Sequence, residues 1–123
     1  MRSLPLYRAI LLAIALLLPA AAFAHHGWSW TTGGNIRLTG TVVEARLGNP
    51  HGELVVEVDG ERWTVEVGQP WRNRRSGLED GDLAPGTEIT VEGEPDADPE
   101  TRVLKVERLW LDGRKHELYP ERD

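Results

Sequence analysis

Alternating apolar and polar side chains after residue 35 predict a series of short β-strands. The clearest pattern covers 53–59 and 61–67, where an apolar side chain stands at every second position. Asp59-Gly60 between these segments is a dipeptide that favours a tight hairpin turn. We therefore expect a β-hairpin with one apolar face for a core and one mostly polar face for solvent.

Further segments have the composition of strands: 36–47, 86–93, 102–111 and 114–119. In the first of them the alternation changes phase near Val42-Val43, two residues after Gly40. A glycine and a phase shift inside a strand are typical of a bulge or sharp bend, as a small barrel requires. The last segment is short and polar, which is typical of an edge strand, and the tail 120–123 is expected to fray.

One short helix is expected over 71–76, between the third and fourth strands. Pro70 suits the first turn of a helix, and Gly77 ends it. This order of elements predicts an all-β fold, a small OB-like barrel of five to six strands with one short helix between strands three and four. A β-sandwich of two small sheets is the alternative.

The first 24 residues have the features of a secretory signal peptide. Arg2 and Arg8 flank the start of the apolar run 9–18, and Ala22-x-Ala24 supplies the small residues of a cleavage site. The run is shorter than the roughly 20 apolar residues of a membrane-spanning helix. We expect a helical signal peptide over 1–24, a single mature domain over 25–123, and export to the periplasm. An uncleaved anchor is the alternative, and cleavage after Ala22 would also be acceptable.

Composition narrows the classes of partner. The chain has no cysteine, so the exported domain must be stabilised by apolar packing without disulfides. Removal of residues 1–24 takes away two arginines and no acidic residue, which changes the formal net charge from −6 to −8. Such an acidic domain is a poor candidate for binding nucleic acid or anionic membranes, and no stable membrane anchor remains after cleavage. Cations are plausible partners.

Candidate metal ligands gather at the predicted mature N-terminus. After cleavage behind Ala24, His25 would offer both its amine and its imidazole nitrogen to one ion. His51, in a turn, could supply a third nitrogen, and His26 is an auxiliary or competing donor. Three nitrogens in a T suit Cu(II), so copper is the expected ion. Cleavage after Ala22 would place His25 third, an arrangement that also binds Cu(II) and Ni(II).

Other interpretations of the same residues stay open. Adjacent histidines at a terminus are often only solvated, and His116 on a polar strand is expected at the surface. No nucleophile and base stand at a spacing typical of catalysis, which favours a binding role over an enzyme. The alternative function is a non-metal module that binds a ligand or a protein partner in the cell envelope.

Several short motifs together resemble a family of small exported bacterial proteins of unknown function. They are His25-His26-Gly27-Trp28, Leu38-x-Gly40-x-Val42, Asn49-Pro50-His51, Gly60 with Trp63, and Arg75-x-Gly77-Leu78. The resemblance implies an OB-like barrel in which the two histidine motifs occur together. It implies no activity. The chain departs from the pattern at Leu47-Gly48, where an aromatic residue is expected before Asn49.

Overall fold

The structure is a computed structural model that describes residues 27–122. The predicted signal peptide, His25 and His26 lie outside the described residues. The chain divides into two compact units, residues 1–30 and 31–123. In the first unit only 27–30 are described, and they form a turn. Among the described residues, no helix has the length and apolar character needed to cross a membrane.

The described residues of the second unit form six strands, one α-helix and one 3-10 helix. In chain order they are β1 (Ile36–Arg46), β2 (Glu53–Val58), β3 (Glu61–Glu66), α2 (Pro70–Arg75), η2 (Asp80–Leu83), β4 (Glu88–Pro95), β5 (Val103–Leu111) and β6 (Arg114–Glu117). The predicted strands and the short helix are thus all present, with ends that differ from the prediction by at most two residues.

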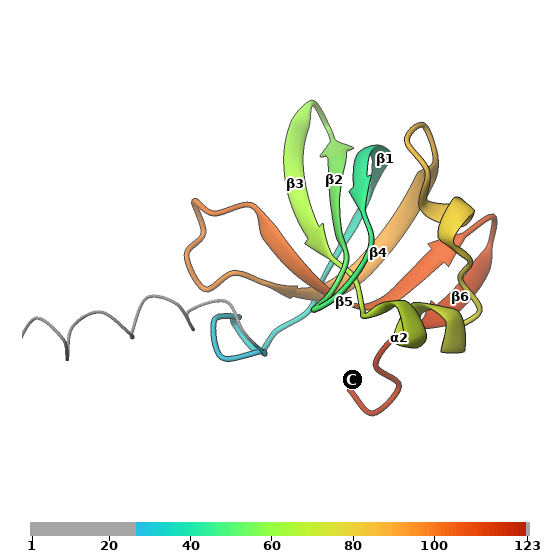
Figure 1. Cartoon of the computed structure of the whole chain (residues 1–123). Coiled ribbons are helices and arrows are strands. Elements are labelled where there is room, and N and C mark those ends of the chain that lie inside the picture. The colour runs from blue at the N-terminus through green and yellow to red at the C-terminus, as the bar shows by residue number, and fades with distance from the viewer. Residues whose placement is uncertain (1–26, 123) are drawn as a thin grey trace, which may run out of the picture. The chain divides into compact units, whose positions relative to one another are not determined.

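The strands form a closed barrel. Their order is β3-β2-β1-β4-β5-β6, with antiparallel neighbours throughout. A parallel pairing of β3 with β5 closes five of them into a barrel, and β6 extends β5. The helix α2 lies at the end of the barrel away from the tip of the β2–β3 hairpin (Figure 1). This confirms the expected OB-like barrel and excludes the two-sheet sandwich.

Two breaks in register bend the long strands. One lies between Val42 and Glu44 where β1 pairs with β2, which confirms the predicted bulge, and the other lies between Glu92 and Gly93 in the β4–β5 pair. At Gly93 a Cβ atom would stand 1.9 Å from the backbone oxygen of Lys105. Only glycine lets the two backbones come this close at the bend.

Aliphatic side chains from all five strands of the closed barrel form the core. Leu78, Leu83 and Leu118, which lie outside the strands, also belong to it. On β2 the predicted alternation holds, because Leu54, Val56 and Val58 are buried. On β3 it fails at the end of the strand, where Glu66 is buried beside Val65. The expectation of a solvent-facing polar side is therefore wrong for Glu66.

Strand β5 is buried on both of its faces over most of its length, including the polar side chains of Lys105, Glu107 and Arg108. It pairs with β3, β4 and β6, so it is the most enclosed strand of the sheet. Buried charges require partners, because an isolated ion away from water is very costly. A polar network supplies these partners.

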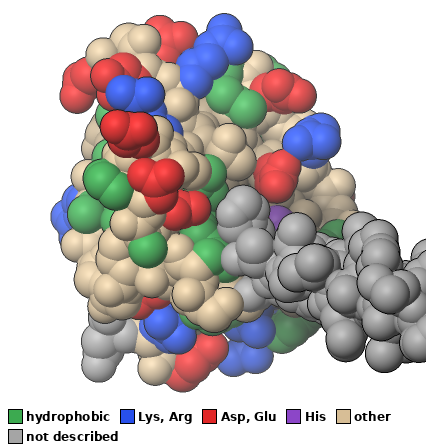
Figure 2. All heavy atoms as spheres, turned by 90° about the vertical axis from the view of Figure 1, so that its left-hand side faces the viewer, with side chains coloured by type: hydrophobic (Ala, Val, Ile, Leu, Met, Phe, Trp, Pro, Cys, Tyr) green, Lys and Arg blue, Asp and Glu red, His purple; other side chains and the backbone are tan. Residues whose placement is uncertain are grey.

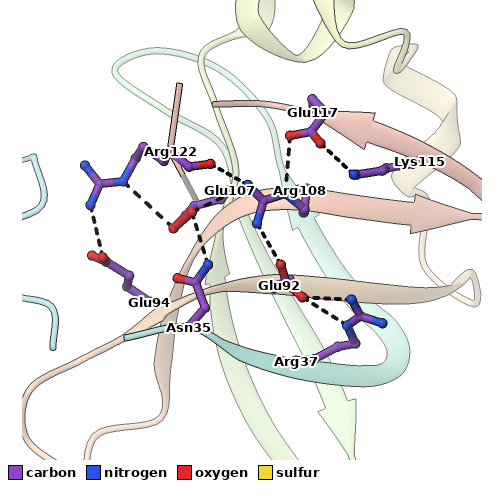
Figure 3. Close-up of polar contacts among 9 residues, drawn as sticks. All are labelled: Asn35, Arg37, Glu92, Glu94, Glu107, Arg108, Lys115, Glu117 and Arg122. Atoms are coloured by element: carbon purple, nitrogen blue, oxygen red, sulfur yellow. Dashed lines mark hydrogen bonds and ion pairs between the residues drawn. The ribbon is translucent and has the colours of Figure 1, made fainter. Parts of the chain in front are cut away.

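Arg108 is the centre of that network (Figure 3). Its guanidinium donates to Glu92 Oε1 at 2.7 Å, to Glu117 Oε2 at 3.2 Å and to the backbone oxygen of Arg122 at 2.5 Å. Glu92 also accepts two hydrogen bonds from Arg37. One arginine therefore joins β4, β5, β6 and the C-terminal segment.

The C-terminal segment is held in place by the same network. Arg122 donates to Glu94 Oε1 at 3.0 Å and lies 3.8 Å from Glu107 Oε2, as Figure 3 shows. Glu107 also accepts a hydrogen bond from Asn35. The expectation of a frayed tail is therefore wrong for Pro120–Arg122, because buried carboxylates on β4 and β5 bind it.

The network lowers the pKa values of two carboxyl groups. The hydrogen bonds from Arg37 and Arg108 hold the pKa of Glu92 below its usual value of 4.5. Lys115, and then Arg108, lower the pKa of Glu117 in the same way. A carboxylate whose pKa is lower in the folded than in the unfolded chain stabilises the fold at neutral pH and loses this effect as the pH falls through the folded pKa.

Gly93→Ala is expected to destabilise the barrel by roughly 3 kcal/mol or more, because the new methyl group meets backbone that cannot move away alone. Urea denaturation of both proteins measures the difference. Gly81→Ala is the matched control, since a Cβ there meets nothing within 4 Å. Equal stability of the Gly93→Ala protein and the wild type would contradict the close approach of β4 and β5.

Arg108→Gln is expected to cost roughly 2 kcal/mol at neutral pH, because it removes the charged hydrogen bonds that a largely buried guanidinium donates to two partly exposed carboxylates. The usual pKa of Glu92 and Glu117 is 4.5. As the pH falls below this value and the two groups become protonated, the difference between variant and wild type in the free energy of unfolding should shrink. Denaturation at a series of pH values tests both statements. Arg102→Gln removes an exposed pair with Glu61 and should cost about 1 kcal/mol or less; an equal cost for both variants would refute the central role of Arg108.

Candidate metal centre

The β2–β3 hairpin places two glutamates side by side. Glu53 is the first residue of β2, Glu66 is the last residue of β3, and the two are direct cross-strand partners. Side chains of directly opposed residues in an antiparallel pair lie on the same face of the sheet. The register of the hairpin, set by the tight turn at Asp59-Gly60, thus brings two carboxylates together at its open end.

His51 joins this pair from the turn between β1 and β2. The backbone of the next residue, Gly52, donates to Gly68 and accepts from Val67, which ties the turn to the chain that leaves β3. A Cβ at Gly52 would stand 2.8 Å from the Val67 side chain, so only glycine allows this contact. These contacts hold His51 next to the end of β3, although 15 positions separate it from Glu66.

The three side chains converge on one small volume. His51 Nε2 lies 2.5 Å from Glu66 Oε1 and 3.8 Å from Glu53 Oε1. One ligand atom from each residue lies within 4.8 Å of the other two. Glu66 is almost completely buried, whereas His51 and Glu53 are partly open to solvent. The cluster therefore has a buried base and an accessible side.

The chemistry of the donors fits a metal ion. An imidazole nitrogen and carboxylate oxygens are ligands of zinc, copper and iron, with bond lengths of about 2.0–2.2 Å. An ion bound to both His51 and Glu66 would require a separation of at least about 2.8 Å between the two ligand atoms, which follows from two such bonds at a right angle. The two side chains must therefore move apart by a few tenths of an ångström when an ion enters.

A shallow cavity of about 390 Å³ adjoins the cluster, lined by Arg46, Leu47, Gly48, Asn49, Pro50, His51 and Glu53. At its edge Arg46 donates to Glu53 Oε2 at 2.7 Å. Only Oε2 of Glu53 is engaged in this way, and Oε1 is the oxygen directed to His51. An ion could reach the cluster from this side without passing through the core.

Lys105 lies on the buried side of the cluster, as the residue opposite Glu66 in the parallel β3–β5 pair. Burial lowers the pKa of this lysine, and the nearby Glu66 carboxylate opposes part of that effect. The ammonium group and the carboxylate thus stabilise each other's charged form inside the barrel wall. This gives a physical reason why a buried glutamate is tolerated at the end of β3.

The sequence predicted three ligands, and the structure places one of them. His51 lies in the cluster, whereas His25 and His26 fall outside the described residues, so their approach to His51 remains a prediction. The expectation that His116 lies at the surface is wrong. Its side chain is buried, and Nδ1 lies 2.9 Å from the Ser76 carbonyl oxygen. His116 serves the packing of β6 against the residue that follows α2.

Sequence reasoning missed Glu53 and Glu66, although a signal for them exists. Counting outward from the turn at Asp59-Gly60 pairs residue 53 with residue 66, so the predicted hairpin already implied the carboxylate pair. The position of His51 beside that pair depends on the path of the turn between β1 and β2. It could not be derived by counting residues from the hairpin turn. Figure 2 shows acidic and basic side chains intermixed over one face of the molecule.

Solved structures of other proteins share the fold. The chain matches a ZRD-deleted mutant of TiaS, crystallised in complex with agmatine, with a TM-score of 0.51 and 15% identity over 68% of this chain. It matches the S. pombe Stn1-Ten1 complex with a TM-score of 0.51 and 14% identity over 63% of this chain. The chain spans 26% of the TiaS chain and 57% of the matched chain of the complex. At these identities the likeness shows the OB-type barrel alone.

No curated protein matches the chain. A protein-family model does, over residues 13–105, which include β1 to β4, the start of β5 and all three residues of the cluster. The resemblance to an uncharacterised family is thereby confirmed, and the chain belongs to the family of unknown function DUF6152.

Proposed function

We propose that this protein is exported to the periplasm and binds a transition metal, copper above others, at the cluster of His51, Glu53 and Glu66. The mature N-terminal residue His25 completes the site, with His26 as an auxiliary donor. One observation carries the proposal: the partly exposed imidazole of His51 stands beside a buried carboxylate and a second, partly exposed one. The role is carriage or sensing of the ion.

The choice of copper rests on the nitrogen donors. The barrel supplies one imidazole and up to two carboxylates, a set that several divalent ions accept. The amine and imidazole of His25 would add two more nitrogens and turn the site into one that favours Cu(II). Without that terminal chelate, the barrel residues alone would discriminate poorly between zinc and copper.

A second candidate function is a module that binds a protein of the cell envelope. It is supported by Trp71 on α2, which is 48% exposed and is the one exposed large hydrophobic residue in the described part of the chain. Arg74 and Arg75 lie exposed on the same helix. An exposed indole beside cations is typical of contact surfaces. Trp71 is not part of the metal cluster, so Trp71→Ala should leave metal binding unchanged.

His51→Ala is expected to weaken copper binding by at least about tenfold, because it removes the imidazole that the barrel contributes. Copper titration of protein purified from the periplasm, against a competing chelator, measures the affinity. Intact mass fixes the cleavage site in the same material. Glu57→Gln, an exposed glutamate on the same strand as Glu53, is the matched control and should bind copper as the wild type does.

Two outcomes separate the parts of the proposal. Unchanged copper affinity of the His51→Ala protein would rule out the barrel cluster as the site. A version with one extra N-terminal residue should bind less tightly, because His25 then has no free amine. Equal affinity of that version would reject the chelate formed by the His25 amine and leave the barrel cluster in place.

A further inference from the structure

We infer that the cluster of His51, Glu53 and Glu66 selects oxidised copper, Cu(II), and that reduction to Cu(I) releases the ion. The inference rests on the proposed metal-binding function and adds the oxidation state and the means of release. It is argued from the barrel residues, which are the same for either predicted cleavage site.

The donor atoms are the first argument. The cluster offers one imidazole nitrogen and carboxylate oxygens, and the partly open cavity beside it is lined by no sulfur-containing side chain. The whole sequence has no cysteine and only one methionine, Met1, inside the predicted signal peptide. Soft sulfur ligands are the ones that favour Cu(I), whereas nitrogen and oxygen donors in a tetragonal arrangement favour Cu(II). The mature chain cannot provide a sulfur-rich site at all.

Charge is the second argument. Two carboxylates neutralise a doubly charged ion, whereas they leave one negative charge in excess around Cu(I). The buried position of Glu66 strengthens this preference, because Coulomb energies grow as water is excluded. Arg46 next to Glu53 and Lys105 opposite Glu66 offset part of it. We therefore expect each carboxylate to contribute a factor of about ten to the preference for Cu(II), a moderate value for a charge pair near a protein surface.

The release step needs one electron and no change in the protein's covalent structure. A one-electron donor such as ascorbate reduces bound Cu(II) to Cu(I), and the donor is oxidised to its radical. The side chains keep their covalent bonds and charges. Their coordination bonds to Cu(I) would break, because oxygen donors hold Cu(I) weakly, and the ion would leave. A site with a hundredfold preference for Cu(II) lowers the reduction potential of bound copper by about 120 mV relative to the free ion, since tenfold corresponds to 59 mV for one electron.

Two titrations of the mature protein test the inference. Cu(II) affinity is measured in air against a nitrogen–oxygen chelator, and Cu(I) affinity is measured without oxygen, in the presence of ascorbate, against a bicinchoninate probe. The wild type should bind Cu(II) at least about a hundredfold more tightly than Cu(I), which follows from the two carboxylates. Glu66→Gln and Glu53→Gln should each reduce that ratio about tenfold. Glu57→Gln should leave it unchanged.

The outcomes separate this inference from the proposed function. Failure of the wild type to bind either ion would reject the metal site itself. Tight binding of Cu(II) together with equally tight binding of Cu(I) would reject only the selection of oxidised copper. A ratio that does not change in the Glu66→Gln protein, with circular dichroism of a folded barrel, would show that the buried carboxylate plays no part in it.

Discussion

The parallel pairing of β3 with β5 is the constraint on which the rest of this structure depends. It closes the barrel and turns β5 into a strand with neighbours on both sides and cover on both faces. Three charged side chains of β5, Lys105, Glu107 and Arg108, are buried in this strand. Each buried charge needs a partner. The Arg108 network and the C-terminal segment supply hydrogen-bonding partners to Glu107 and Arg108.

The same closure creates the candidate metal centre. It buries Glu66 at the end of β3 and places Lys105 opposite it. The hairpin register adds Glu53, and the backbone contacts of Gly52 add His51. A buried carboxylate, an exposed carboxylate and an imidazole thus meet where two turns and a strand end converge. A rigid barrel wall beneath an accessible turn is a suitable arrangement for a site that binds and releases an ion.

The fold was largely predictable because it follows from local patterns. The alternation on β2, the turn at Asp59-Gly60 and the phase shift near Val43 each have a local physical cause, and each was confirmed. The buried state of Glu66 and of His116 was not predictable. Both depend on segments that are distant in the chain, β5 for the glutamate and Ser76, which follows α2, for the histidine. Local patterns do not contain that information.

We propose that His51 and Glu66 together bind one ion at the barrel wall. Anomalous diffraction at the copper edge, from crystals of the mature protein grown with Cu(II), would locate this ion. We expect one strong peak about 2.0–2.2 Å from His51 Nε2 and from a carboxylate oxygen of Glu66. A copper peak elsewhere on the molecule, with these two side chains still in mutual contact, would contradict it.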